Sequence, residues 1–202
     1  MSNATLIRTV FRYLLLLAVI AFPVAAQSMK DKDLAKKMND DADKAVSAKK
    51  YPEAIALYEK SLTLQPSNSI AHYRKGFVHF NLEENDLAVN EFTIALAQGY
   101  KPLDIYRIRY SAYLRQNNYD AALADVKKGL AIVPNDLTLL NAVGEINYAR
   151  GSYPEALAAY QKSLQISPNN ADIYNHLARV NSALGDSMAQ AAAAETTLKL
   201  GS

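Results

Sequence analysis

Apolar residues recur at helical spacing in short segments of this chain, and proline, glycine or asparagine separates the segments. Two of the segments are nearly the same: residues 51–66 read YPEAIALYEKSLTLQP, and residues 153–168 read YPEALAAYQKSLQISP. Ten of these 16 positions are identical, and the two stretches lie 102 residues apart. The pattern therefore predicts an amphipathic helix that the chain repeats.

A shorter period, one third of that spacing, accounts for this similarity. A step of 34 in residue number connects residues of one kind through most of the chain. We call each set of residues spaced by 34 a column. The small column is Ala54, Ala88, Ala122 and Ala156, and the aromatic column is Tyr58, Phe92 and Tyr160, with Val126 at the remaining position. The leucine column is Leu62, Leu96, Leu130, Leu164 and Leu198. A period held over four units without an insertion predicts a repeat architecture.

Each column has a physical meaning within a helix–turn–helix unit. Pro52 and Pro154 suit a first helical turn, and Pro66, Pro134 and Pro168 stop helices because the residue before proline avoids the α region. Small residues let two helices approach closely, and the aromatic and leucine columns fill the space between units. A single unit cannot bury its apolar side alone, so the units must stack.

This register resembles the tetratricopeptide repeat, which has small residues at positions 8, 20 and 27, an aromatic at 24 and proline at 32. Position 8 is Ala42, Gly76, Tyr110, Gly144 and Ala178, so the third unit departs from the pattern. The resemblance implies an all-α, right-handed α-solenoid of about five helix–turn–helix repeats. The expected units are 35–68, 69–102, 103–136, 137–170 and a degenerate cap at 171–200 whose outer face meets water, after a polar linker at 27–34.

Residues 1–26 have the pattern of a secretory signal peptide. Arg8 and Arg12 precede the apolar run at 14–22, and small residues at 24–26 follow it. We expect cleavage after Ala26, which predicts a periplasmic or secreted protein without stable membrane insertion afterwards. The alternative is a membrane tether formed by an uncleaved N-terminal anchor.

Charge and composition exclude several classes of function. Without Arg8 and Arg12 the chain has equal numbers of basic and acidic residues, which is unlike a nucleic-acid-binding protein. The chain has no cysteine, and His72 and His79 lie seven residues apart, so we expect no metal and no cofactor. No catalytic motif is present either, and we expect no enzyme.

In tetratricopeptide arrays the first helix of each unit lines a concave groove, which nominates residues at register positions 5, 9, 12 and 13 for partner binding. These are Tyr73, Phe77, Phe80, Arg107, Ser111, Leu114, Arg115, Asn141, Glu145 and Tyr148. Aromatic rings with arginine and asparagine suit a peptide segment, because rings give rigid apolar contact and arginine binds carboxylates. For Phe77 and Phe80 the alternative is packing between units, as we also expect for Tyr106, Tyr110 and Tyr113.

The carboxylate clamp known from this family, which grips the C-terminal tails of cytosolic chaperones, is absent. Its five positions hold Asn39, Asp43, Arg74, Asp104 and Ile108 here, and of these only Arg74 is cationic. The resemblance thus implies an adaptor or scaffold of the periplasm or cell envelope that binds peptide segments of partner proteins. Two alternatives stay open: a self-associating structural spacer that forms homo-oligomers, and a small-ligand receptor or enzyme built on the groove.

Overall fold

The computed structural model describes residues 27–201, and over this range the protein has ten helices and no strand. The first described helical stretch covers residues 27–47. It is followed by α2 (Tyr51–Leu64), α3 (Ser69–Asn81), α4 (Asn85–Ala97), α5 (Pro102–Arg115), α6 (Tyr119–Ile132), α7 (Leu137–Ala149), α8 (Tyr153–Ile166), α9 (Ala171–Leu184) and α10 (Ser187–Gly201). The predicted all-α solenoid of helix–turn–helix units is confirmed.

The N-terminal predictions have different outcomes. The expected leader, residues 1–26, lies outside the described residues. Residues 27–34, which we expected to form a linker, are helical and continuous with the first helix of unit one. Their alternation of Lys and Asp is compatible with a solvent-exposed helix, so polarity alone was a poor sign of a linker.

The turn inside each unit has the same backbone conformation five times. Lys49, Glu83, Asn117, Gly151 and Gly185 all have positive φ, between 57° and 81°, and they recur with the repeat at register position 15. Several turn residues also cap the helix that follows by accepting one of its backbone N–H groups: Asn118 in the turn inside unit three, and Asn68, Asp136 and Asn170 in the turns between units. The period of the sequence is therefore present in the turns as well as in the core.

The core is a series of contacts between small and large side chains. Ala54, Ala88, Ala122 and Ala156 are fully buried, as are Tyr58, Phe92 and Tyr160, with at most 2% of their surface exposed. In the third unit the sizes are exchanged, because Tyr110 is large at position 8 and Val126 is small at position 24, and both belong to one buried cluster. The departure at Tyr110 is thus compensated within its own unit.

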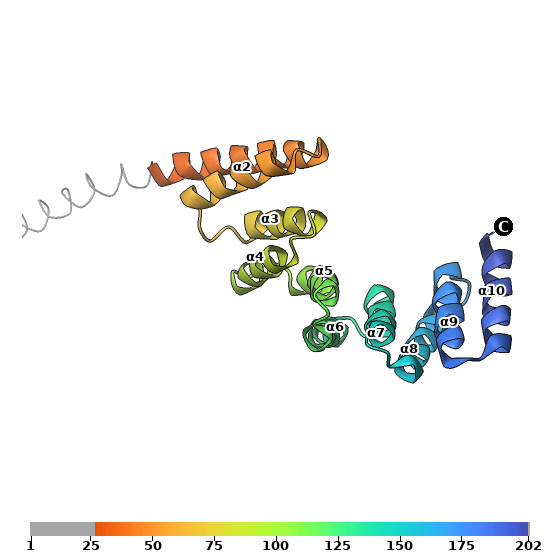
Figure 1. The fold of residues 1–202 in the computed structure, drawn as a ribbon. Helices are drawn as coiled ribbons and strands as arrows, with labels where there is room; N and C mark the ends of the chain where they lie inside the picture. The colour runs from red at the N-terminus through yellow and green to blue at the C-terminus, as the bar shows by residue number, and fades with distance from the viewer. Residues whose placement is uncertain (1–26, 202) are drawn as a thin grey trace, which may run out of the picture.

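The helix pairs stack into a curved array (Figure 1). The first helices of units two to five, α3, α5, α7 and α9, lie toward the inside of the curve, and α4, α6, α8 and α10 lie outside it. α2, α4, α6 and α8 each contact the first helix of the following unit. Among the described residues, no helix combines the length and apolar character that crossing a membrane requires.

Candidate functional site

All ten residues nominated from the sequence lie on α3, α5 and α7, three helices on the inside of the curve (Figure 1). Unit one adds Asp43 and Val46 at the equivalent positions 9 and 12 of its first helix. The individual contacts separate the ten residues into those that can meet a partner and those that are already occupied within the chain.

An apolar hollow lies at the junction of units one and two. Its volume is about 250 Å³, and it is lined by Asp43, Val46, Tyr58, Tyr73, Arg74 and Phe77. Phe77 leaves 39% of its surface exposed, which is unusual for a phenylalanine in a packed array. The structure therefore brings two of the residues selected from the sequence, Tyr73 and Phe77, together in one hollow, and it adds lining residues from unit one that the sequence analysis did not select. Their role in partner binding stays a prediction.

A closed polar network forms the rim of this hollow. The Tyr58 hydroxyl donates a hydrogen bond to Oδ1 of Asp43 at 2.5 Å, and the Arg74 guanidinium pairs with Oδ2 of the same carboxylate. Burial, together with the bond to Asp43, raises the pKa of Tyr58 and keeps its hydroxyl protonated. Because Arg74 and Asp43 satisfy each other, the open part of the hollow is its apolar wall.

Tyr73 and Phe80 are partly core residues. The Tyr73 ring stacks on Tyr100, with centroids 4.3 Å apart and planes 13° apart. Phe80 packs against the cluster of α4 and α5, and Arg115 covers its ring at 4.0 Å and donates to the Phe80 carbonyl at 3.0 Å. Phe80 and Arg115 thus hold α3 against α5. Phe80 therefore packs between units, which is the alternative that the sequence analysis gave for this residue.

Arg107 is not the free cation that its groove position suggested. Its Nε and Nη2 lie 2.7 and 2.5 Å from Oδ2 of Asp136, whose other carboxylate oxygen caps α7 by accepting the Leu139 N–H. Asp136 is buried at the turn between units three and four, 29 residues along the chain, so no local pattern showed this pair. Ser111 and Leu114 stay half-buried beside it, and Leu114 packs against the core cluster of units three and four.

The end of the groove near the C-terminus is polar and aromatic. Glu145 on α7 is exposed, and among the described residues no side chain or backbone group forms a hydrogen bond or ion pair with it. The Arg179 guanidinium lies over the ring of Tyr148 at 4.7 Å, and the His176 ring stacks on Tyr160 at 4.8 Å. Asn141, one turn before Glu145, has a buried Oδ1 without a partner.

Sequence reasoning missed the ion pairs between inner and outer helices. Arg109 and Asp125 form a buried bidentate pair at 2.7 and 2.8 Å, and Arg109 also donates to Thr93. In unit two, Lys75 and Glu91 occupy the same register positions as Arg109 and Asp125, and their charged groups lie 3.2 Å apart. This recurrence of a basic and an acidic residue one repeat earlier is the sequence signal that could have revealed the pairs. These pairs join the two helices of a unit and take no part in the groove.

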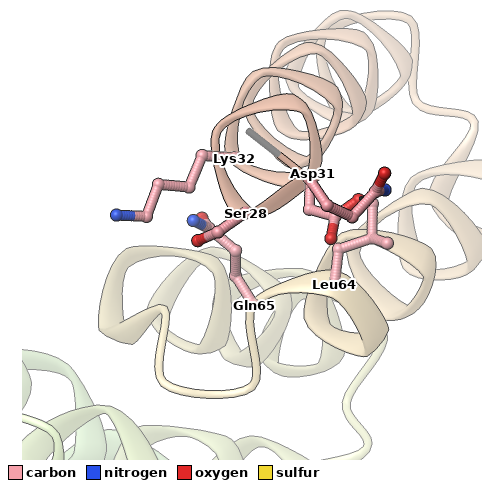
Figure 2. A pocket seen from close by; sticks show the side chains of 6 residues that line it. Ser28, Asp31, Lys32, Leu64 and Gln65 are labelled. Atoms are coloured by element: carbon pink, nitrogen blue, oxygen red, sulfur yellow. Dashed lines mark hydrogen bonds between the residues drawn. The ribbon is translucent and has the colours of Figure 1, made fainter. Parts of the chain in front are cut away.

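Another hollow, of about 360 Å³, lies between residues 27–32 and the end of α2 (Figure 2). Its lining is largely polar and includes Gln27, which donates to Asp31 at 2.8 Å, together with Lys32 and Gln65. It adjoins the boundary of the described residues, and none of its lining residues is aromatic. We therefore place the candidate site at the apolar hollow.

Comparison with known proteins supports the repeat register. Family models described as TPR repeat match residues 42–83 and 144–185, and one described as tetratricopeptide repeat matches 78–136. Curated relatives include the Hsp70-Hsp90 organising protein of Plasmodium falciparum, 27% identical over 105 residues, and serine/threonine-protein phosphatase 5 of Rattus norvegicus, 26% identical over 102 residues. These matches cover 48% and 50% of this chain but only 18% and 20% of the two relatives.

Solved structures share the fold. A MamA fragment from Desulfovibrio magneticus RS-1 superposes with a TM-score of 0.77 at 18% identity, over 84% of this chain and 96% of the fragment. YrrB, described as a TPR protein with an unusual peptide-binding site, gives a TM-score of 0.70 at 20% identity, over 89% of this chain and 92% of its own. The matched repeats, the period of the core and the helix pairs together show that this chain belongs to the tetratricopeptide-repeat family.

Proposed function

We propose that this protein is a binding scaffold without catalytic activity that holds a peptide segment of a partner protein on the inside of its curve. The observation that carries this proposal is the apolar hollow at the junction of units one and two, where Phe77 remains partly exposed. Relatives named as an Hsp70-Hsp90 organising protein and as Hsc70-interacting proteins, and a neighbour described by its peptide-binding site, support a role of this class.

The hollow favours one large apolar side chain as the anchor of the bound segment. A volume of about 250 Å³ accommodates a leucine, methionine or phenylalanine side chain, and rings of Tyr58, Tyr73 and Phe77 provide contact on several sides. Buried apolar anchors supply much of the free energy in peptide recognition, at about 1.5–3 kcal/mol for a fully buried side chain. We infer that the partner presents such a residue.

The groove is unsuited to a terminal carboxylate at this junction. Arg74 is the cation among the five positions that a carboxylate clamp would use, and Asp43 already neutralises it. A carboxylate placed there would compete with Asp43 and meet its negative charge. The chaperone tails that such clamps bind are therefore not proposed as partners.

We place this scaffold in the periplasm, cell envelope or secreted fraction, on the evidence of residues 1–26 alone. The measurement is the intact mass of the exported chain, expected to begin at Gln27, combined with fractionation. A chain that retains residues 1–26 in the membrane fraction would favour the tethered alternative.

Peptide display on the purified chain tests the binding role. We expect selected peptides to share a large apolar residue and to lose at least tenfold in affinity with Phe77→Ala, because the wall of the hollow is removed. Leu87→Ala on α4 is the matched control, since Leu87 is 50% exposed and lies on an outer helix. If no peptide is selected, or if Phe77→Ala binds like the wild type, this groove is not the site.

Self-association remains a second candidate function because of α10. The cap was expected to present a water-facing surface, but Met188 is 86% and Leu198 is 75% exposed. Leu198 continues the leucine column whose earlier members are covered by the next unit, so α10 ends the described array with an apolar face. A concentration-dependent dimer by sedimentation that Leu198→Glu abolishes would support the spacer role; a monomer at all concentrations would exclude it.

A further inference from the structure

The junction of units four and five repeats the layout of the apolar hollow with different chemistry. A step of 102 in residue number, three repeats, converts the Asp43, Tyr58 and Arg74 of the first junction into Glu145, Tyr160 and His176. The same step converts Val46 into Tyr148 and Phe77 into Arg179. One end of the groove therefore has an apolar hollow, and the equivalent positions at the other end hold polar and aromatic side chains.

The acidic residue is satisfied at the first junction and unsatisfied at the second. Asp43 accepts a hydrogen bond from Tyr58 and pairs with Arg74. Glu145 has neither contact, because the side chain at the position of Arg74 is His176, which stacks flat on the Tyr160 ring, with planes 3° apart. Burial lowers the pKa of His176, and nearby Arg179 lowers it further, so the imidazole is neutral at pH 7 and supplies no counter-charge.

Arg179 does not replace the missing partner. Its guanidinium is stacked over the Tyr148 ring, and it forms no ion pair with the Glu145 carboxylate within the described residues. The surrounding protein atoms raise the pKa of Glu145 even though Arg179 acts in the opposite direction. The Glu145 side chain is nevertheless exposed, so its carboxylate is accessible to a partner and has no counter-charge in contact among the described residues.

We propose that Glu145 is a binding site for a basic side chain, lysine or arginine, of the partner segment. The Glu145 carboxylate is exposed and supplies the counter-charge, and the equivalent Asp43 at the first junction pairs with an arginine in this way. Arg179 over Tyr148 shows that a guanidinium fits this surface. The inference rests on the proposed peptide-binding function and adds that a partner has an apolar anchor at one end and a basic residue at the other.

A double-mutant cycle on peptides from the display experiment tests this site. We expect enrichment of lysine or arginine in peptides selected on the wild type, and loss of that enrichment on Glu145→Gln. For one selected peptide, Glu145→Gln and replacement of the peptide's basic residue by glutamine should each weaken binding about five- to tenfold, and the two changes together should weaken it no further.

The controls separate the possible failures. Glu155→Gln, on outer helix α8, changes the net charge equally at an exposed position and should leave affinity unchanged. Peptides that bind but show no basic enrichment, or independent effects in the cycle, overturn the Glu145 site and leave the proposed function intact. Enrichment of acidic residues that depends on Arg179 would also overturn it. If no peptide binds at all, both proposals fall.

Discussion

The ring of Phe92 packs directly on Gly76. A Cβ atom added to Gly76 would lie 2.9 Å from both Cδ1 and Cε1 of that ring, closer than such atoms approach in proteins. Gly144 and Tyr160 repeat this relationship with a separation of 2.6 Å. At the third unit Tyr110 faces Val126 in one cluster, so the large side chain has moved to the other helix. In units one to four, each pair of positions 8 and 24 therefore combines one large aromatic side chain with a smaller residue, although the aromatic changes position in unit three.

Gly144→Ala should destabilise the protein by roughly 1–2 kcal/mol. The methyl group meets the rigid ring of Tyr160, and overpacking of about 1–3 kcal/mol exceeds the ~1 kcal/mol that alanine gains over glycine in a helix. Gly201→Ala near the end of α10 is the control, because nothing lies within 4 Å of the added methyl group. Chemical denaturation measures both variants, and a Gly144→Ala variant as stable as Gly201→Ala would contradict the packing described.

Asp125→Ala should cost about 3–5 kcal/mol, because it leaves the buried Arg109 guanidinium without its counter-charge. The double variant Arg109→Met with Asp125→Leu should recover most of that loss, since two apolar side chains need no partner. Unfolding by urea checks both variants. If the single and the double variants were equally destabilised, the lost stability would come from the ion pair itself and not from the unpaired Arg109 charge, contrary to this prediction.

Arg107→Glu should lower the free energy of unfolding by about 1 kcal/mol, because it places a second carboxylate beside Asp136 and disturbs the cap of α7. The sequence analysis selected Arg107 for partner binding only, and a role in stability follows from the pair with Asp136. Lys127→Glu on the exposed face of α6 is the control with the same charge change. A melt identical to that of the control would argue against the Arg107–Asp136 pair.

The sequence predicted the architecture well because the period is visible in side-chain volume. The small and aromatic columns of the repeat determine which helices pack, and the helices begin and end where the prolines and turn residues indicated. The groove was predicted less well. Whether Arg107 is free depends on Asp136, which lies in the turn between units three and four, and whether Glu145 is paired depends on the orientation of the His176 ring. Register positions specify a face of a helix, but they do not specify the partners on that face.

Glu145→Gln should stabilise the protein slightly at neutral pH, by less than about 1 kcal/mol because the side chain is exposed. Although this side chain is exposed, the surrounding protein atoms raise the pKa of Glu145 above its ordinary value, so the folded state disfavours its charged form. The resulting loss of stability is absent at pH values below the pKa that Glu145 has in the unfolded state, because the group is then protonated in both states. It is fully present at pH values above the pKa of the folded state. Melting temperatures of both proteins from pH 3 to 8 should therefore coincide in acid and diverge as pH rises; a constant difference would contradict this assignment.

Glu83→Gly should raise the free energy of unfolding by about 1 kcal/mol. Glu83 has a φ of 61°, a left-handed conformation that costs a residue with a Cβ roughly 1–2 kcal/mol and costs glycine almost nothing. The chain itself uses glycine at the same register position in units four and five, as Gly151 and Gly185. Part of the gain is lost because glycine has a more flexible unfolded state.

Lys60→Gly, at an exposed position within α2, is the control and should destabilise by about 1 kcal/mol, since that backbone is right-handed. Denaturant unfolding distinguishes the two signs, and a loss of stability in both variants would mean that the turn of unit two does not adopt the left-handed conformation.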